Sequence, residues 1–235
     1  MHVVHLYHSG VKVELDQCTL VFDWWYTKLP GWGKDELRLR PDKKLFVFVS
    51  HAHHDHYRPD IWDLADRYPQ THATFVVDQA IASDAPAHGN VDLVPCQPDQ
   101  AYELGGLEVQ TMRSTDEGLA FYASCQGTSV YHAGDLNVWW WPNRDISLNE
   151  QSVKDCADYL APIEGRRVDL AFVPLDPRLG AGGDRGLELY MQHVGSNVVV
   201  PIHYGDDLAV AKRLASSKRL KPWSDRILFA DELDL

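Results

Sequence analysis

Six consecutive residues, His51-Ala52-His53-His54-Asp55-His56, form the densest group of metal-binding side chains in this chain of 235 residues. His51, His53 and His56 offer imidazole nitrogens, and Asp55 offers a carboxylate. Such mixed nitrogen and oxygen donors suit zinc, iron or manganese and leave a position open for water. The alternative is a solvated histidine-rich loop, but this segment is internal, follows an apolar run and contains an acid. The cluster is therefore predicted to bind a metal.

The apolar run at residues 45–49 predicts a buried strand that delivers the cluster at its carboxyl end, where open α/β sheets place ligand sites. Three further candidates, Asp23, Asp135 and His203, also follow strand-like runs. Asp23 either starts a turn or supports the metal loop, and the sequence leaves both readings open. Asp135, which follows Gly134, either bridges two metals or shapes a turn. His203 is either a core histidine or a ligand, and the nearby cluster favours the ligand.

The remaining pattern alternates strands with helices, without a linker of disordered composition. We expect one α/β domain over residues 1–235, with two βα halves at approximately 1–125 and 126–235. Two sheets packed face to face, with helices outside, account for this pattern. Strands or hairpins are expected at 3–7, 11–15, 19–22, 74–77, 91–94, 103–109, 119–124, 129–132, 169–174, 197–202 and 227–229, and helices at 59–68, 149–160, 187–194 and 207–216.

Composition excludes some functions. The 22 Lys and Arg residues against 34 Asp and Glu residues give a net charge of −12, which argues against a nucleic-acid surface. No signal peptide and no apolar run long enough for a membrane span are visible, so a cytoplasmic protein is expected. The four cysteines form no CxxC pair and predict neither a zinc knuckle nor a disulfide framework.

The order of these residues resembles the metallo-β-lactamase superfamily over nearly the whole chain. The cluster matches its His-x-His-x-Asp-His motif, and Gly134-Asp135 and His203 follow in the expected order. The details are most similar to the branch of ascorbate-phosphate lactonases and related metal-dependent hydrolases. The resemblance implies an αββα sandwich of two packed mixed β-sheets. It also implies one metal held by His51, His53 and Asp135, and another held by Asp55, His56, Asp135 and His203.

One family feature is missing. The family supplies a further histidine to the first metal between the cluster and Gly-Asp, but residues 113–118 contain none. Asp116 or Glu117 can replace it with oxygen, and we expect Asp116 to do so, because Glu117 would point the other way in extended chain. His8 is a second candidate, for which a turn histidine or a substrate contact is favoured over metal ligation.

Two other segments have open interpretations. Trp139-Trp140-Trp141 follows Asp135 closely and forms either core packing or an aromatic wall over a substrate. Asp176 ends another strand-like run, and Arg178 can bind a phosphate or carboxylate of a substrate or simply hold Asp176.

These features predict a metal-dependent hydrolase in which a metal-bound hydroxide attacks an ester, lactone or phosphoester of a small molecule. Asp55 would orient the water, and the metal at His203 would stabilise the developing charge. The expected cofactors are one or two divalent ions, zinc or manganese, with iron also suitable. The alternatives are a non-catalytic metal-binding protein and a di-iron redox protein. No nucleic acid or membrane partner is expected, and a homo-oligomer is compatible with the sequence.

Overall fold

The computed structural model describes residues 1–69, 71, 73–86 and 92–235, and these residues form two compact units. The first unit contains Met1–Gln97 and Ala230–Leu235, and the second contains Pro98–Phe229. The division therefore lies at residue 97, not near residue 125. Residues 98–125 belong to the second unit because their strands pair with the strand that follows them.

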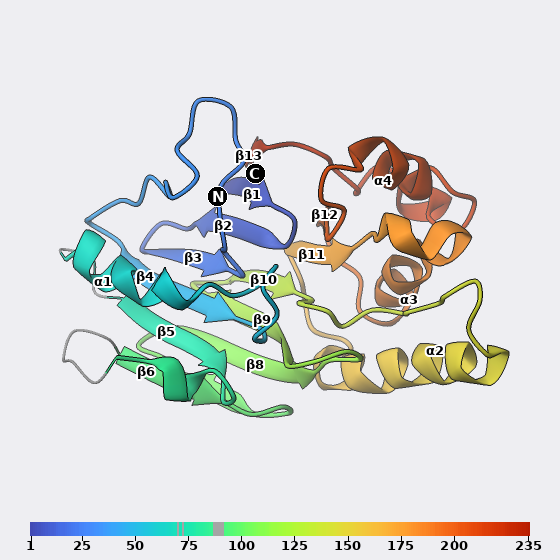
Figure 1. Cartoon of the computed structure of the whole chain (residues 1–235), viewed down its shortest axis with the longest axis horizontal. Coiled ribbons are helices and arrows are strands. Elements are labelled where there is room, and N and C mark those ends of the chain that lie inside the picture. Colours follow the sequence, from blue (N-terminus) through green and yellow to red (C-terminus); the bar gives the residue numbers. More distant parts are fainter. Residues whose placement is uncertain (70, 72, 87–91) are drawn as a thin grey trace. The chain divides into compact units, whose positions relative to one another are not determined.

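The first unit is built on a seven-stranded mixed sheet in the order β13-β1-β2-β3-β4-β5-β6. Pairs from β13 to β3 are antiparallel, and pairs from β3 to β6 are parallel. The strands are β1 (His2–Tyr7), β2 (Gly10–Glu14), β3 (Cys18–Phe22), β4 (Lys44–Val49), β5 (Ala73–Asp78), β6 (Asp92–Cys96) and β13 (Glu232–Asp234), with helix α1 (Leu64–Arg67) and 3-10 helices η1 (Pro59–Asp63) and η2 (Ala82–Asp84) (Figure 1).

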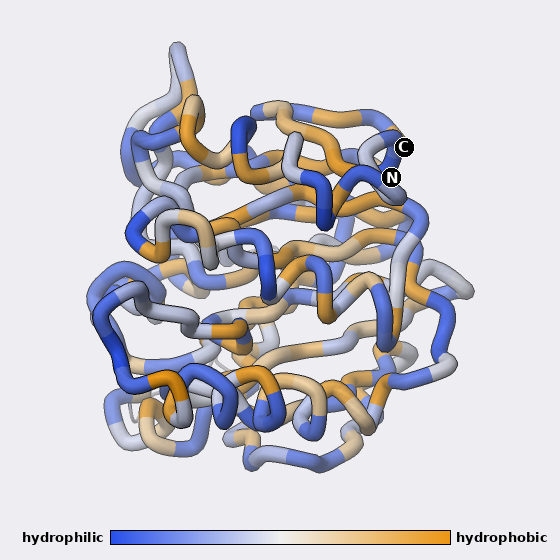
Figure 2. The backbone as a smooth tube through the Cα atoms, turned by 90° about the vertical axis from the view of Figure 1, so that its right-hand side faces the viewer, coloured by the Kyte–Doolittle hydropathy of each residue, from blue (hydrophilic) through white to orange (hydrophobic). Residues whose placement is uncertain are grey.

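The continuous apolar run of β4 has a structural reason. Both neighbours of β4 are parallel strands, and Leu45 to Val49 are all buried. A strand that is covered on both faces has an unbroken run of apolar residues in its sequence, instead of alternating apolar and polar residues. In this unit Val47 packs with Phe75 and Ile61 in one core cluster. Figure 2 shows the same pattern as hydrophobic colour along strands and hydrophilic colour at turns.

The second unit has a six-stranded mixed sheet in the order β12-β11-β10-β9-β8-β7. Pairs from β7 to β10 are antiparallel, and β10, β11 and β12 are parallel. The elements are β7 (Ala101–Glu103), β8 (Leu107–Arg113), β9 (Leu119–Cys125), β10 (Thr128–His132), α2 (Ile146–Leu160), η3 (Ala161–Ile163), β11 (Leu170–Pro174), η4 (Pro177–Gly182), α3 (Arg185–His193), β12 (Val198–Ile202), α4 (Leu208–Ala215) and η5 (Lys221–Trp223).

Helices of the second unit share a core with its sheet. Leu160 of α2, Tyr190 of α3 and Leu214 of α4 belong to one buried cluster with strand residues such as Val173. The Tyr131 and Tyr190 rings stack at 4.7 Å between centroids. Such an aromatic pair adds about 0.5–1.5 kcal/mol beyond area burial. These contacts hold the sheet that carries Asp135 and His203.

The two mixed sheets with helices confirm the predicted α/β class, but two element predictions need correction. The segment 59–68 is a 3-10 helix followed by one α-helical turn, because Ile61 N–H bonds to Arg58 O three residues back (3.1 Å). Residues 227–229 form only one bridge, between Ile227 and Val199. The last strand is instead β13, which pairs with β1. Val91, expected to begin a strand, lies outside the described residues.

Among the described residues, no helix combines the length and the apolar composition needed to cross a bilayer.

Candidate functional site

Parallel pairing of β3 and β4 places Asp23 beside Ser50 in the first unit. Phe22 is in register with Phe48, and Asp23 N–H donates to Phe48 O (3.0 Å). Carboxyl ends of parallel strands meet at one edge of a sheet, so the residues after each strand become neighbours. Asp23 has a positive φ of 42° and is completely buried. This left-handed conformation turns the chain sharply at the strand end.

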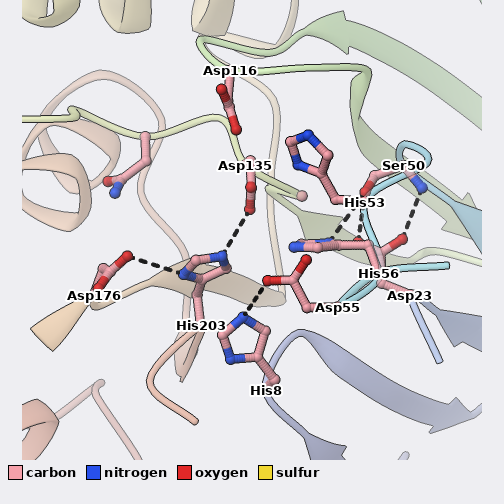
Figure 3. Close-up of polar contacts among 12 residues, drawn as sticks. His8, Asp23, Ser50, His53, Asp55, His56, Asp116, Asp135, Asp176 and His203 are labelled. Atoms are coloured by element: carbon pink, nitrogen blue, oxygen red, sulfur yellow. Dashed lines mark hydrogen bonds and ion pairs between the residues drawn. The ribbon is translucent and has the colours of Figure 1, made fainter. Parts of the chain in front are cut away.

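The Asp23 carboxylate accepts hydrogen bonds from Ser50 and His56. Ser50 donates through its backbone N–H to Oδ1 and through its hydroxyl to Oδ2, both at 2.7 Å. His56 donates Nδ1–H to Oδ2 at 2.8 Å (Figure 3). Because the carboxylate only accepts, a neutral His56 carries its proton on Nδ1 and its lone pair on Nε2. This is the arrangement in which a histidine coordinates a metal through Nε2.

Ser50 also influences which ring nitrogen of His51 carries the proton. Its hydroxyl proton is used toward Asp23, so its oxygen accepts from His51 Nδ1 (2.9 Å). His51 Nε2 then carries a lone pair and lies 3.0 Å from His53 Nδ1. Two donors on a tetrahedral zinc, each at about 2.0–2.1 Å, are about 3.3 Å apart. The His51 and His53 nitrogens therefore fit a shared metal.

His8 lies at the turn between β1 and β2, also with a positive φ, of 55°. His5 Nε2 donates to His8 O at 2.9 Å and holds this turn. The His8 Nε2 atom lies 3.3 Å from Asp55 Oδ2, and donor atoms of His8, Asp55 and His56 all lie within 4.8 Å of one another. Burial opposes ionisation of Asp55, but the hydrogen bond from His8, together with the nearby imidazole of His56, outweighs it and lowers the pKa of Asp55.

The second unit presents its candidates at the carboxyl ends of β10, β11 and β12. Gly134 takes a φ of 51°, and Leu136 N–H closes a tight turn on Ala133 O (2.9 Å). This turn holds the buried Asp135, while His203 follows β12 with a φ of 65°. His203 Nε2 lies 3.2 Å from Asp135 Oδ1, again near the separation of two ligands of one metal (Figure 3).

Asp176 supports His203 from the other side. Its Oδ2 lies 3.3 Å from His203 Nδ1, and Arg178 donates to both of its carboxylate oxygens through Nε (3.0 and 2.9 Å). Burial alone would raise the pKa of Asp176, but the bonds from His203 and Arg178 lower it to about 2. The ionised Asp176 favours a proton on His203 Nδ1, which leaves the Nε2 lone pair to bind a metal. Of the two interpretations of Arg178, the contact with Asp176 is observed.

The tryptophans after Asp135 contact its neighbours directly. Trp139 donates its indole N–H to Asp135 O (3.1 Å), and its ring meets that of His203 edge-on at 5.7 Å. Trp141 is stacked against Trp139 at 6.4 Å, and the Arg178 guanidinium lies 6.0 Å from the Trp141 ring. Trp139 is buried, whereas Trp140 and Trp141 are partly exposed. The segment combines core packing with an aromatic surface beside His203.

Asp116 lies on an exposed turn that is tied to the Asp135 segment. Thr115 Oγ1 donates to Asn137 O (2.6 Å) and accepts from Asn137 N–H (2.9 Å). Asp116 N–H bonds to Ser114 Oγ at 3.2 Å. Asp116 is exposed, and Figure 3 draws its side chain above Asp135. Coordination by Asp116 stays a prediction.

Ser50 contacts both Asp23 and His51, and the sequence analysis did not single it out. Its position in the sequence could have indicated this role, because a small hydroxyl residue between a buried strand and the first histidine can donate a hydrogen bond to an acid on the neighbouring strand. Asp23 bonds both Ser50 and His56, and its role in supporting a metal stays a prediction.

Comparison with solved structures places this fold among known ones. The chain is similar to Igni18 from the archaeon Ignicoccus hospitalis, described as a novel metallo hydrolase, with 17% identity, a TM-score of 0.63, and coverage of 100% of this chain and 98% of that one. It is also similar to YhfI from Bacillus subtilis, a metallo-beta-lactamase fold protein (14% identity, TM-score 0.61, 99% of each chain).

A third similar structure is CmlA from Streptomyces venezuelae, described as a diiron beta-hydroxylase, with 12% identity and a TM-score of 0.60. The likeness covers 100% of this chain and 53% of that one. No protein-family model matches the sequence, and no curated protein matches it significantly. At these identities the comparisons establish the metallo-β-lactamase fold and leave the activity open.

Proposed function

We propose that this protein is a metal-dependent hydrolase acting on an ester, lactone or phosphoester of a small molecule. The observation that carries the proposal is the hydrogen-bond network around Asp23. In the neutral imidazoles of His51 and His56 it favours a proton on Nδ1 and leaves the Nε2 lone pair to bind a metal. The buried Asp23 carboxylate and Ser50 hydroxyl orient two histidines, as the residues around metal ligands do. A solvated histidine-rich loop would not require such buried partners.

The ligand sets implied by the family resemblance remain part of this proposal: His51, His53 and Asp135 for one ion, and Asp55, His56, Asp135 and His203 for another. When bound, divalent ions supply a water of lowered pKa and polarise the oxygen that gains charge. Asp55, held ionised beside His8, is proposed to orient the attacking water. His203, braced by Asp176, is proposed to keep its Nε2 in place as charge develops.

The tryptophan segment and Arg178 suggest how a substrate is received. Trp139 and Trp141 present stacked rings beside His203, and Arg178 adds a positive charge whose side chain is 60% exposed. We propose that an apolar part of the substrate lies against Trp141. The lactonase-like branch of the family stays a proposal for the substrate class.

The experiment that tests this function combines metal analysis with a substrate panel. Protein purified without added metal should contain about one or two zinc, manganese or iron ions per chain. It should hydrolyse at least one activated ester, lactone or phosphodiester, and a chelator should abolish that turnover. Absence of both metal and turnover after reconstitution with each of the three ions would refute the proposal.

A second candidate function is oxygen or redox chemistry at two irons. The candidate donors include three carboxylates, Asp55, Asp116 and Asp135, and oxygen donors make iron and manganese more competitive with zinc. CmlA, which shares this fold, is described as a diiron enzyme. Retention of two irons with no hydrolysis across the panel would favour this candidate. Bound metal with neither hydrolysis nor oxygen consumption would favour a non-catalytic metal-binding protein.

We predict that Asp116 serves the first metal in place of the missing histidine, directly or through water. The support is the tether from Thr115 to Asn137, which ties the Asp116 turn to the Asp135 segment. Asp116→Ala should weaken one metal by about ten- to a hundredfold and spare the other, and Asp116→His should shift preference toward zinc. Isothermal titration with zinc and manganese measures both effects. Glu117→Ala is the matched control, because it removes the adjacent exposed carboxylate.

We also predict no meaningful affinity for DNA or RNA at physiological salt, because the net charge is −12. A gel-shift assay with single- and double-stranded oligonucleotides checks this, and binding that weakens with rising salt would contradict it. A cytoplasmic location and a homo-oligomeric state stay proposals that fractionation and light scattering can test.

A further inference from the structure

A hollow of about 720 Å³ lies in the second unit beside the carboxyl end of α4 and the following η5. Three lysines, Lys212, Lys218 and Lys221, line it together with Ser217, Ile227 and Phe229. Its volume is within the range of small-molecule sites, about 300–1,000 Å³. All of these residues come from one short stretch of chain, which differs from the parts that carry Asp135 and His203.

The charge of this stretch is opposite to that of the whole chain. Residues 212–229, which contain the whole lining, include six Lys and Arg residues and one acid, Asp225, although the chain has a net charge of −12. In the part of the chain that the structure describes, none of the three lysine ammonium groups pairs with a carboxylate. By contrast, the neighbouring Arg219 pairs with Asp184 at 2.9 Å. Like charges around one hollow repel each other, and a bound anion would relieve this repulsion.

The hydroxyl groups indicate which kind of polar ligand fits. Ser216 donates to Lys212 O (2.8 Å) and Ser224 donates to Lys221 O (3.1 Å), so both protons are used within the chain. Ser217 Oγ instead accepts from Leu220 N–H (3.3 Å) and keeps a proton to donate. The lysines are therefore the main donors, which favours an anion over a neutral sugar or polyol.

Two apolar side chains of the lining, Ile227 and Phe229, are called the floor of the hollow. Ile227 is buried, Phe229 is partly exposed, and Lys212 Nζ lies 6.0 Å from the Phe229 ring centroid. A flat ligand group can lie against this floor while its anionic group reaches the ammonium ions. A positive charge near the carboxyl end of a helix is favoured by the helix dipole, and this accounts for Lys212 in the last turn of α4. It does not account for Lys218 and Lys221, which lie beyond the helix.

We propose that this hollow is a second ligand site that binds a small organic phosphate with a flat apolar group, of the size of a mononucleotide. The site is separate from the proposed hydrolase centre, and its occupant is recognised by phosphate charge and by the apolar floor. A single hollow with three lysines can hold one phosphate group, whereas a nucleic acid needs a basic track along many phosphates.

Calorimetric titration of the full chain at about 0.15 M salt tests the proposal with three probes: AMP, pyrophosphate and adenosine. We expect AMP to bind saturably and more tightly than pyrophosphate, and adenosine to bind most weakly. Lys212→Gln, Lys218→Gln and Lys221→Gln should each weaken AMP about two- to fivefold, and the triple variant at least about tenfold, as expected for partly exposed ion pairs. Phe229→Leu should reduce the difference between AMP and pyrophosphate.

The matched control is Arg213→Gln, which removes an exposed positive charge from the same helix outside the lining. It should leave AMP affinity within about twofold, and metal content should be the same in all variants. Absence of saturable AMP binding, or equal weakening by Arg213→Gln and the lysine variants, would overturn the proposal. Binding to vesicles that contain phosphatidic acid, without binding to AMP, would also overturn it and indicate a lipid surface instead.

Discussion

Replacing His56 or His203 with alanine is expected to remove most hydrolytic activity, at least about a hundredfold, and to lower the bound metal. Removing only a residue that supports a metal ligand typically lowers metal affinity or activity about 10- to 100-fold. Removing the ligand itself should lower them by at least as much. Metal content by mass spectrometry and turnover of the best substrate from the panel are the two measurements. Full activity with unchanged metal in both variants would contradict the assigned roles.

The backbone conformation at residue 203 must be considered when the effect of His203→Ala is interpreted. His203 has a φ of 65°, which alanine adopts less readily than asparagine or glycine. His203→Asn is therefore the better variant for separating loss of the imidazole from backbone strain. His193→Ala is the matched histidine control, because His193 is exposed and bonds to Glu164 (2.6 Å). Added metal should raise the melting temperature of the control but not that of the His203 variants, since ligand binding stabilises the folded state.

The second large effect is expected at Asp23, which contacts no substrate in this proposal. Asp23→Asn keeps the shape but replaces one acceptor oxygen with an N–H₂ group. Whichever way the amide lies, that group faces either the Ser50 N–H or the donors on Ser50 and His56. We expect metal affinity to fall about 10- to 100-fold and the metal-free fold to lose about 1–3 kcal/mol, because a buried donor is left without an acceptor.

Metal titration and chemical denaturation, each with and without chelator, measure these two effects of Asp23→Asn. Asp16→Asn is the control, since Asp16 is an exposed acid in the turn before β3. If Asp23→Asn lost stability but bound metal as tightly as the unaltered chain, Asp23 would be a structural residue and the proposed orientation of His56 would be wrong.

The sequence predicted a structural feature correctly where the residues of a single strand were enough to determine it. The run at residues 45–49 predicted β4 because a strand between parallel neighbours must be apolar on both faces. The role of Asp23 depended on which strand lies beside β4, and no local pattern contains that information. Only the pairing of β3 with β4 brings Asp23 to Ser50. The contact of Arg178 with Asp176, two residues away, was one of two open interpretations, and the turn after β11 selects it.

Weak local signals explain the errors in the element predictions. Ile227-Leu228-Phe229 is apolar and β-prone, but only Ile227 bridges to Val199 before the chain leaves that sheet. Glu232-Leu233-Asp234 has two acids and no strand pattern of its own, and pairing with β1 decides its conformation. Tertiary pairing therefore overrides propensity at both segments.

The pairing of β13 with β1 also has a consequence for synthesis on the ribosome. The first unit is interrupted in sequence, because residues 98–229 are translated between β6 and β13. At about 5–20 residues per second, β1 waits on the order of ten seconds for its outer neighbour. During that time its edge, with Val3 and Val4, is open to pairing with other nascent chains. Chaperone demand during translation should therefore concentrate on this edge.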